Sequence, residues 1–282
     1  RLLTAFVREY EATFREPIYL IIDEYDQWAN DVLASSFKSV PTPTSPGGTL
    51  NPFYARLKQI ATKGTIGRIF ITGVTTIQLD SMTSGFSLAK NFTTNARFTT
   101  MFGFTERELR NLISQLVDLK QYGKSLDEVL IRMKEWYNGY CFNPDMQETV
   151  FNSSMCLNYL SSIAETGREP RSMLDPSVAN SLDKIEAVLS LGDSEFVRDI
   201  VSRALNNRPI PFEGDLKVLN LNTQEFLDEQ NLLSALFYMG FLTFAPNDWK
   251  TLTVPNRAIG IQFFEYYFKN ILNAPRYTFD AE

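Results

Sequence analysis

The sequence predicts an α/β protein in which a parallel sheet comes first, a helical region follows, and a small tail mixes strands with helices. Two short apolar runs rich in β-branched residues, "IYLII" (18–22) and "IGRIFITGV" (66–74), are typical of buried strands. Each follows a segment with helical spacing of its apolar residues, at 1–15 and at 53–64. Helices that alternate with strands in this way are typical of a parallel sheet with covered faces.

The limits of these elements follow from local signals. Gly64 is typical of a helix C-cap, and Gly73 is expected to end the second strand. Thr105 and Glu108 have the spacing of a capping box, which predicts a helix over 105–119. Before that helix we expect a helix at 26–37, a Pro- and Gly-rich loop at 39–52 and loop-like chain at 75–98. After it, the chain is expected to be mainly helical to about residue 238. The end of the chain is expected to form a helix (229–240), two strands (241–245 and 251–256) and a last helix (259–272). These patterns suggest three domains, at 1–115, 116–230 and 231–282.

The composition excludes several kinds of chemistry. The chain has 282 residues, 44% of them hydrophobic, and a net charge of −6, which fits a packed globular protein without an overall basic footprint for nucleic acid. It contains no histidine, so neither a Ser-His-Asp triad nor an imidazole-bound metal can be built. Any reaction therefore has to use carboxylates, lysines, hydroxyls and a hard cation bound through oxygen.

The sequence also carries signals about location. Its apolar runs are shorter than the roughly 20 residues of a membrane span, and its start lacks the pattern of a signal peptide. The two isolated cysteines, Cys141 and Cys156, suit a reducing compartment. We therefore expect an intracellular protein, cytoplasmic or nuclear, that makes no membrane contact. The chain does not begin with Met, and we expect it to be a fragment or a processed form.

Three acids follow the first strand within four positions, in "IIDEYD". Asp23 comes directly at the carboxyl end of the strand, where it could hold Mg²⁺ through water while the cation bridges the phosphates of ATP. Glu24 could polarise an attacking water as a general base. Thr72, at the end of the second strand, is placed to contact the γ-phosphate and that water, because ligands of open α/β sheets bind at the carboxyl ends of strands. Alternatively, the three acids have no function and are simply charged residues in solvent at the end of a strand.

One part of such a nucleotide site is missing from the sequence. A P-loop needs a Gly-rich loop followed by Lys and Ser or Thr, whose amides hold phosphates at a helix N-terminus. The chain contains no GxxxxGK[ST] pattern. The expected fold is therefore a partial P-loop NTPase sheet, with the P-loop either upstream of Arg1 or absent from the protein.

Several stretches together resemble the AAA-ATPase-like domain family, a group of STAND-like P-loop NTPases often joined to a restriction-type nuclease domain and also found in Crinkler-type effectors. The matching stretches are "YLIIDEYD" (19–26), "FYARLKQI" (53–60), "IFITGVTTIQLDSMTSGF" (69–86), "MFGFTERELRNLI" (101–113), "KEWYNGYCF" (134–142), "VFNSSMCLNYL" (150–160), "LLSALFYMGFLTFAPN" (232–247) and "LTVPN" (252–256). They occur in the family's order over nearly the whole chain. Two departures are Cys141, where the family commonly has Arg, and "RAI" after "PN", where it has an acid.

The resemblance implies a fold and a set of site residues. It implies an NTPase core, a helical region and a winged-helix-like tail, with ATP and Mg²⁺ as cofactors. By position, Asp23 resembles the Mg²⁺-binding acid, Glu24 the catalytic acid and Thr72 the sensor, while Asp26 belongs to the cofactor-binding signature and is expected to orient its loop. Arg97 or a neighbouring subunit could supply an arginine finger.

Other functions remain open from the sequence alone. A nuclease could use "DLK" at 118–120 or 215–217 with Mg²⁺, although so short a pattern is expected by chance. A STAND-like switch would regulate partner proteins according to its nucleotide state. A pseudo-NTPase would only serve as a scaffold that binds partner proteins. The expected partners are a nucleotide, a neighbouring nuclease or effector domain and a second copy of the chain. The aromatic turn "WYNGYCF" is either packed core or a base-stacking surface.

Overall fold

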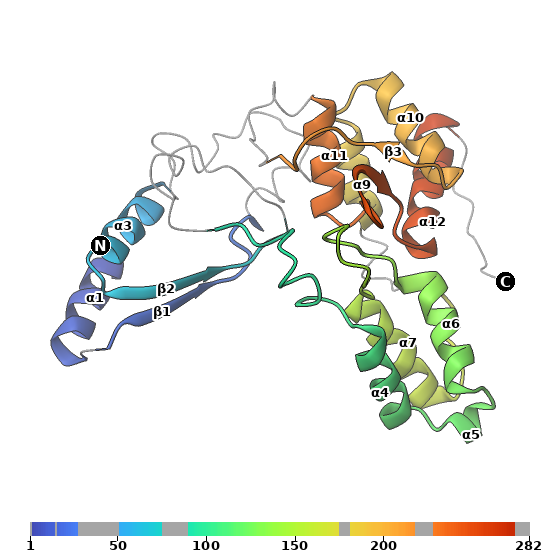
Figure 1. Ribbon diagram of the computed structural model, residues 1–282, viewed down its shortest axis with the longest axis horizontal. Helices are drawn as coiled ribbons and strands as arrows, with labels where there is room; N and C mark the ends of the chain where they lie inside the picture. The colour runs from blue at the N-terminus through green and yellow to red at the C-terminus, as the bar shows by residue number, and fades with distance from the viewer. Residues whose placement is uncertain are drawn as a thin grey trace. The chain divides into compact units, whose positions relative to one another are not determined.

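The computed structural model describes residues 2–14, 16–27, 51–74, 90–174, 181–217 and 228–273 (Figure 1). Most of the predicted helix at 26–37, the loop at 39–52 and much of the loop-like stretch at 75–98 lie outside these ranges. The chain forms two compact units. The first contains residues 1–90 and 217–226, and the second contains 91–216 and 227–282.

The first unit is built on two parallel strands and two helices. The strands β1 (Ile18–Ile22) and β2 (Ile66–Ile71) pair in parallel, with Ile22 opposite Ile71 at their carboxyl ends. The helices α1 (Leu2–Thr13) and α3 (Asn51–Thr62) pack against one face of this pair. This arrangement confirms the predicted α/β class and parallel pairing. The buried core comprises Val7, Tyr54, Leu57, Ile60 and Ile66, with the half-buried Ile18, Leu20, Ile22 and Ile69 packed against it.

The opposite face of the strand pair is exposed within the described structure. Alternate side chains of a strand point to opposite faces, so Tyr19, Ile21 and Phe70 lie away from the core, with exposures of 72%, 73% and 43%. The expectation of strands covered on both faces is therefore wrong for the described residues. The second strand ends at Ile71 rather than Val74, and the chain bends at Val74.

The second unit is mainly helical, as the sequence predicts. Its first helices surround a core formed by residues such as Leu109, Met133 and Tyr159. Residues 91–115, which the sequence grouped with the strand pair, lie in this unit; the three-domain division remains a prediction. The helices are α4 (Glu106–Leu116), α5 (Leu119–Tyr122), α6 (Leu126–Tyr137), α7 (Ser153–Thr166), α9 (Ser181–Leu189), α10 (Ser194–Leu205), α11 (Glu229–Tyr238) and α12 (Arg257–Tyr266), which continues as the π-helical η1 (Tyr267–Ile271).

Local capping signals fix where two of these helices begin. The hydroxyl of Thr105 accepts the Glu108 amide, and the Glu108 carboxylate accepts the Thr105 amide at 2.9 Å, so the predicted capping box is confirmed. Ser125 and Glu128 form a second capping box at α6. Each box satisfies amides that the first helical turn leaves without partners.

A small antiparallel sheet combines a hairpin between α11 and α12 with a short strand that precedes α11 in the sequence. β4 (Thr243–Ala245) and β3 (Ile210–Pro211) both pair with the central β5 (Asp248–Thr253). The sequence predicted the hairpin but not β3, because a two-residue strand leaves no periodic signal. The first hairpin strand begins later than predicted, since the Phe241 amide bonds the Leu236 carbonyl at the end of α11. The winged-helix-like assignment of the tail remains a prediction.

The aromatic turn after α6 is packed, as one of the two interpretations predicted. Trp136 is 1% exposed, and the Arg132 and Arg257 guanidinium groups lie 5.5 and 4.7 Å from its ring centre. Gly139 has φ +102°, and a Cβ there would lie 2.0 Å from the Pro255 carbonyl oxygen. The turn is thereby fixed against the residues that precede α12.

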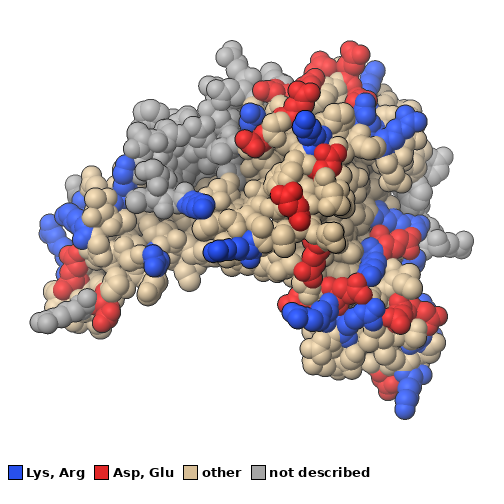
Figure 2. All heavy atoms as spheres, viewed as in Figure 1, with Lys and Arg blue, Asp and Glu red and all other residues tan. Residues whose placement is uncertain are grey.

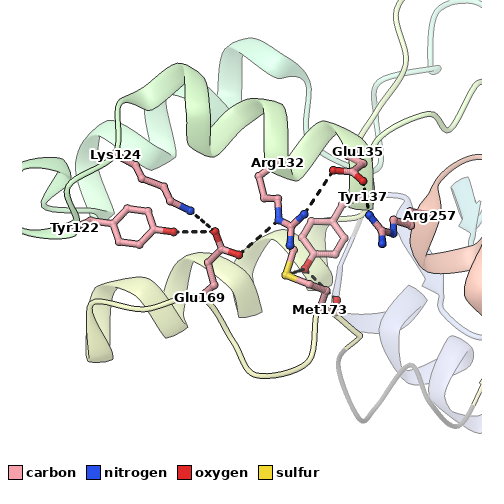
Figure 3. A network of polar contacts seen from close by, with 8 residues as sticks. All are labelled: Tyr122, Lys124, Arg132, Glu135, Tyr137, Glu169, Met173 and Arg257. Carbon is pink, nitrogen blue, oxygen red and sulfur yellow. Dashed lines mark hydrogen bonds and ion pairs between the residues drawn. The ribbon is translucent and has the colours of Figure 1, made fainter. Parts of the chain in front are cut away.

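A polar network runs along this helical region (Figure 3). The Glu169 carboxylate accepts hydrogen bonds from the Lys124 ammonium group at 2.6 Å and from the Tyr122 hydroxyl at 3.0 Å. The Glu135 carboxylate accepts a hydrogen bond from the Arg257 guanidinium group at 2.6 Å. These partly exposed ion pairs connect α6 with the chain after α5, the chain after α7 and α12. Pairs with this exposure each contribute little to stability.

Candidate functional site

The two strand ends of the first unit are held together by backbone hydrogen bonds. The Thr72 amide donates to the Ile22 carbonyl at 2.9 Å, and the Tyr25 amide donates to the Thr72 carbonyl at 3.1 Å. The two segments therefore stay paired beyond the strand ends, although the Tyr25 donor lies three residues after Ile22. This is why Asp23 and Thr72, which are 49 positions apart, lie next to each other.

Asp23 and Thr72 are in direct contact. The Thr72 hydroxyl donates to Oδ1 of Asp23, and the Glu24 amide donates to the same oxygen at 3.0 Å. Within the described residues both bonds end on Oδ1, which leaves Oδ2 for a water-bridged cation. Asp23 is exposed, and carboxylate oxygen is a donor that Mg²⁺ prefers. The residues present therefore fit a hydrated Mg²⁺ at this strand end.

Glu24 is exposed and has an uncommon backbone conformation. Its φ of +50° lies in the left-handed region, which few residues other than glycine adopt. The Gln27 amide donates to the Glu24 carbonyl at 3.0 Å, so the chain reverses direction here. A carboxylate on such a turn lies outside the ladder of the strands and is exposed to water.

Asp26 lies in a different environment from the other two acids. It is only 1% exposed, and its Oδ1 accepts the Val74 amide at 3.1 Å. A Cβ on Gly73 would lie 2.3 Å from this oxygen, so the close approach depends on glycine at that position. Burial, and in second place the nearby Asp26 carboxylate, raise the pKa of the Tyr54 phenol on α3.

The structure therefore separates the three acids instead of gathering them. Among the described residues, no group of three or more Asp, Glu or Cys side chains is placed to hold one metal ion. Asp23 and Glu24 are exposed at the strand end, while Asp26 bonds the backbone after β2. The charge repulsion that three adjacent acids would suffer is reduced by this separation.

Sequence reasoning missed the groups that support Asp26. Tyr54 appeared only as a helical residue, and the Val74 amide belongs to a position expected to lie in a strand. Gly73 was expected only to end β2. Glycine at a strand end also indicates that another group approaches the backbone closely. Gly73 was therefore the sequence signal from which the approach of Asp26 could have been predicted.

The other candidate residues have structural roles or lie elsewhere. Asp118 of the first "DLK" pattern is the N-cap of α5, where it accepts the Lys120 and Gln121 amides at 3.1 Å each. Arg97 is exposed in the second unit, and its amide donates to the Asn95 side chain at 3.0 Å. Within the described ranges, no helix has both the length and the apolar character needed to cross a bilayer.

One comparison with known proteins bears on this site. Residues 1–83 match a family model described as "Predicted AAA-ATPase". The matched part covers α1, β1, α3 and β2, and so all the site residues. The match supports an AAA-ATPase-like family and a general ATPase-like role, with nucleotide as the ligand that such a family binds. No curated protein and no solved structure gives a significant match.

Proposed function

We propose that the protein is a regulatory ATPase of the STAND-like kind, and that the edge formed by Asp23, Glu24 and Thr72 is its hydrolytic site. The observation that carries this proposal is the contact between Thr72 and Asp23 at the carboxyl ends of two parallel strands. In open α/β sheets this edge is where ligands bind. The family match to residues 1–83 supports the general ATPase-like part of this proposal.

Each residue of the edge has a distinct part in the proposed reaction. Mg²⁺ would supply charge neutralisation of the phosphates when it is bound. Asp23 would hold it through Oδ2 and water, while its Oδ1 stays bonded to Thr72. Glu24 would accept a proton from the attacking water. Thr72 would orient that water, and Asp26 would keep the chain after β2 in position through the Val74 amide.

A phosphate-binding loop is required in addition to these residues. The 282 residues contain no P-loop pattern. We propose that such a loop completes the site, and that a nuclease or effector domain and self-association are the outputs that the nucleotide state controls. The helical second unit would then be the part that responds, as in other two-state switches.

The decisive test is turnover by the full-length protein. We expect Glu24→Gln to lower the rate of phosphate release by at least about 100-fold, the usual contribution of a general base, while ATP still binds. Glu16→Gln is the matched control, because Glu16 is an exposed acid before β1, at the opposite end of the strand. Equal rates for the wild type and Glu24→Gln would contradict the proposal.

A scaffold without turnover is the second candidate. The bonds that Oδ1 of Asp23 receives from Thr72 and Glu24 also stabilise the strand ends, and a pseudo-NTPase would keep them. In that case Asp23→Asn would change the unfolding of the first unit, and no ATP-dependent phosphate release would be measured in either variant or wild type.

A further inference from the structure

A cationic cleft between α1 and α3 is a second candidate binding site. It has a volume of about 130 Å³, and its floor is formed by the buried Val7 and Ile60. Three basic side chains line it: Arg8 from α1, Arg56 from α3 and Lys63 from the turn after α3. Its other polar lining residues are Thr4, Glu11, Gln59 and Thr65.

The charge in this cleft is not balanced by the described residues. Glu11 is the only acid in the lining, and it accepts the Thr65 hydroxyl. No ion pair between described residues involves Arg8, Arg56 or Lys63. The cleft thus has three cations against one acid. In Figure 2, basic side chains lie at the left, where Figure 1 places α1 and α3, with acidic side chains directly below them.

Arg56 is held in place by neutral groups. Its Nε donates to the Thr4 hydroxyl at 3.1 Å, and its Nη1 donates to the Gln59 side chain at 2.8 Å. These bonds fix the plane of the guanidinium group without neutralising its charge. A fixed planar guanidinium with free N–H groups is the side chain best suited to bind phosphate oxygens.

The cleft is remote from the proposed hydrolytic edge. Thr65 comes immediately before β2, whereas Thr72 comes immediately after it. A strand of six residues rises by roughly 20 Å, so the two places lie at opposite ends of the strand pair. A ligand in the cleft would therefore not compete with a nucleotide at Asp23 and Glu24.

A larger and more open hollow adjoins the cleft. It shares Glu11 and Thr65 with the cleft and has a volume of about 450 Å³. Its other lining residues include Glu16 and two aromatic residues, Tyr10 and Phe14, whose ring centres lie 5.0 Å apart. Phe14 is 57% exposed. This hollow has room for an organic group attached to a phosphate.

We propose that the cleft between α1 and α3 binds a phosphate group, either free phosphate or the phosphate of a small organic ester. Arg56 would hold two phosphate oxygens, and Arg8 and Lys63 would complete the charge neutralisation. The binding does not depend on the proposed ATPase activity.

The test follows the Arg56 side chain of the 282-residue chain by NMR. The Nε–H signal, assigned by its loss in Arg56→Lys, is recorded while potassium phosphate replaces chloride at constant ionic strength. We expect a saturable shift with a dissociation constant of about 1 mM or below. A parallel titration with phenyl phosphate separates the two ligand sources: tighter binding supports an aromatic ester, and equal binding supports free phosphate.

Two variants decide whether the cleft is responsible. Lys63→Gln should weaken binding about tenfold, the usual effect of one charge-assisted hydrogen bond. Arg68→Gln removes the same charge from an exposed position on β2 outside the cleft lining, and it should change the affinity less than twofold. No saturable shift with either ligand, or equal losses in the two variants, would overturn the proposal. Asp23→Asn should leave the shift unchanged, which separates this site from the hydrolytic edge.

Discussion

The glycine after Thr72 offers the sharpest check on the geometry of the strand ends. A Cβ at position 73 would lie 2.3 Å from Oδ1 of Asp26 and 2.6 Å from Cδ1 of Tyr25. Oδ1 of Asp26 is held, because Asp26 is 1% exposed and this oxygen accepts a hydrogen bond from the Val74 amide. The backbone of Tyr25 is held by the bond from its amide to the Thr72 carbonyl. Gly73→Ala therefore forces the chain after β2 away from the turn that follows β1.

The size of the effect follows from these contacts. Overpacking in a closed site costs typically about 1–3 kcal/mol, which corresponds to about a 5- to 150-fold change in an equilibrium constant. Native-state hydrogen exchange measures this locally, so the two-unit chain need not unfold in one step. The Thr72 amide donates to the Ile22 carbonyl at 2.9 Å. We expect the protection of the Thr72 and Val74 amides against hydrogen exchange to fall by that factor.

The matched control is Gly260→Ala in α12. No atom lies within 4 Å of a Cβ there, and its φ is not in the left-handed region. Alanine is favoured over glycine in a helix by about 1 kcal/mol, so this change should leave the strand ends unaffected and stabilise its helix. If Gly73→Ala left the Thr72 and Val74 amides as protected as in the wild type, the close approach of Asp26 would be wrong.

Two further predictions concern the helical unit. Gly139→Ala should destabilise this unit by about 2–5 kcal/mol in thermal unfolding, because φ is +102° and the added Cβ would lie 2.0 Å from the Pro255 carbonyl oxygen. The control Gly123→Ala, with φ +76° and open space around the position, should cost only about 1–2 kcal/mol. Equal losses of stability in the two variants would refute the close approach of Gly139 to Pro255. Hydrogen bonds from the Thr105 amide and hydroxyl lower the pKa of Glu108 below its ordinary 4.5, so the stability contributed by this capping box is present above that pH and is lost as the pH falls through the lowered folded-state value. A ¹³C titration of the Glu108 carboxyl should show a midpoint below 4.5, and Thr105→Ala should return it toward 4.5.

Sequence reasoning predicted the parts of the fold that depend on local signals. The period of apolar residues placed α1, β1, α3 and β2 within a few residues of their observed limits. The capping box of Thr105 and Glu108 placed the start of α4. Such signals work because a helix end or a strand has to satisfy its own backbone groups and bury its own apolar side.

The sequence also placed Asp23 and Thr72 at corresponding strand ends, because parallel strands present their carboxyl ends at one edge. It assigned different roles to the three acids of "DEYD", but it did not show that Asp26 is buried while Asp23 and Glu24 are exposed. The environment of Asp26 differs from that of Asp23 because residues far away in the chain lie close to it: the Val74 amide donates to it, and Gly73 approaches it closely. Burial of a carboxylate depends on what the rest of the chain places around it, and adjacent positions in a turn can therefore have opposite environments.

The tertiary structure alone decided three further features. The exposed face of the strand pair, with Tyr19 and Ile21, depends on which elements cover the sheet, and an apolar run does not specify this. The two-residue strand β3 exists because β5 offers it a partner. The cationic cleft arises because two helices bring Arg8 and Arg56 together from positions 48 apart. In each case the deciding interaction is between segments distant in the chain, whereas periodicity and capping record only interactions between near neighbours.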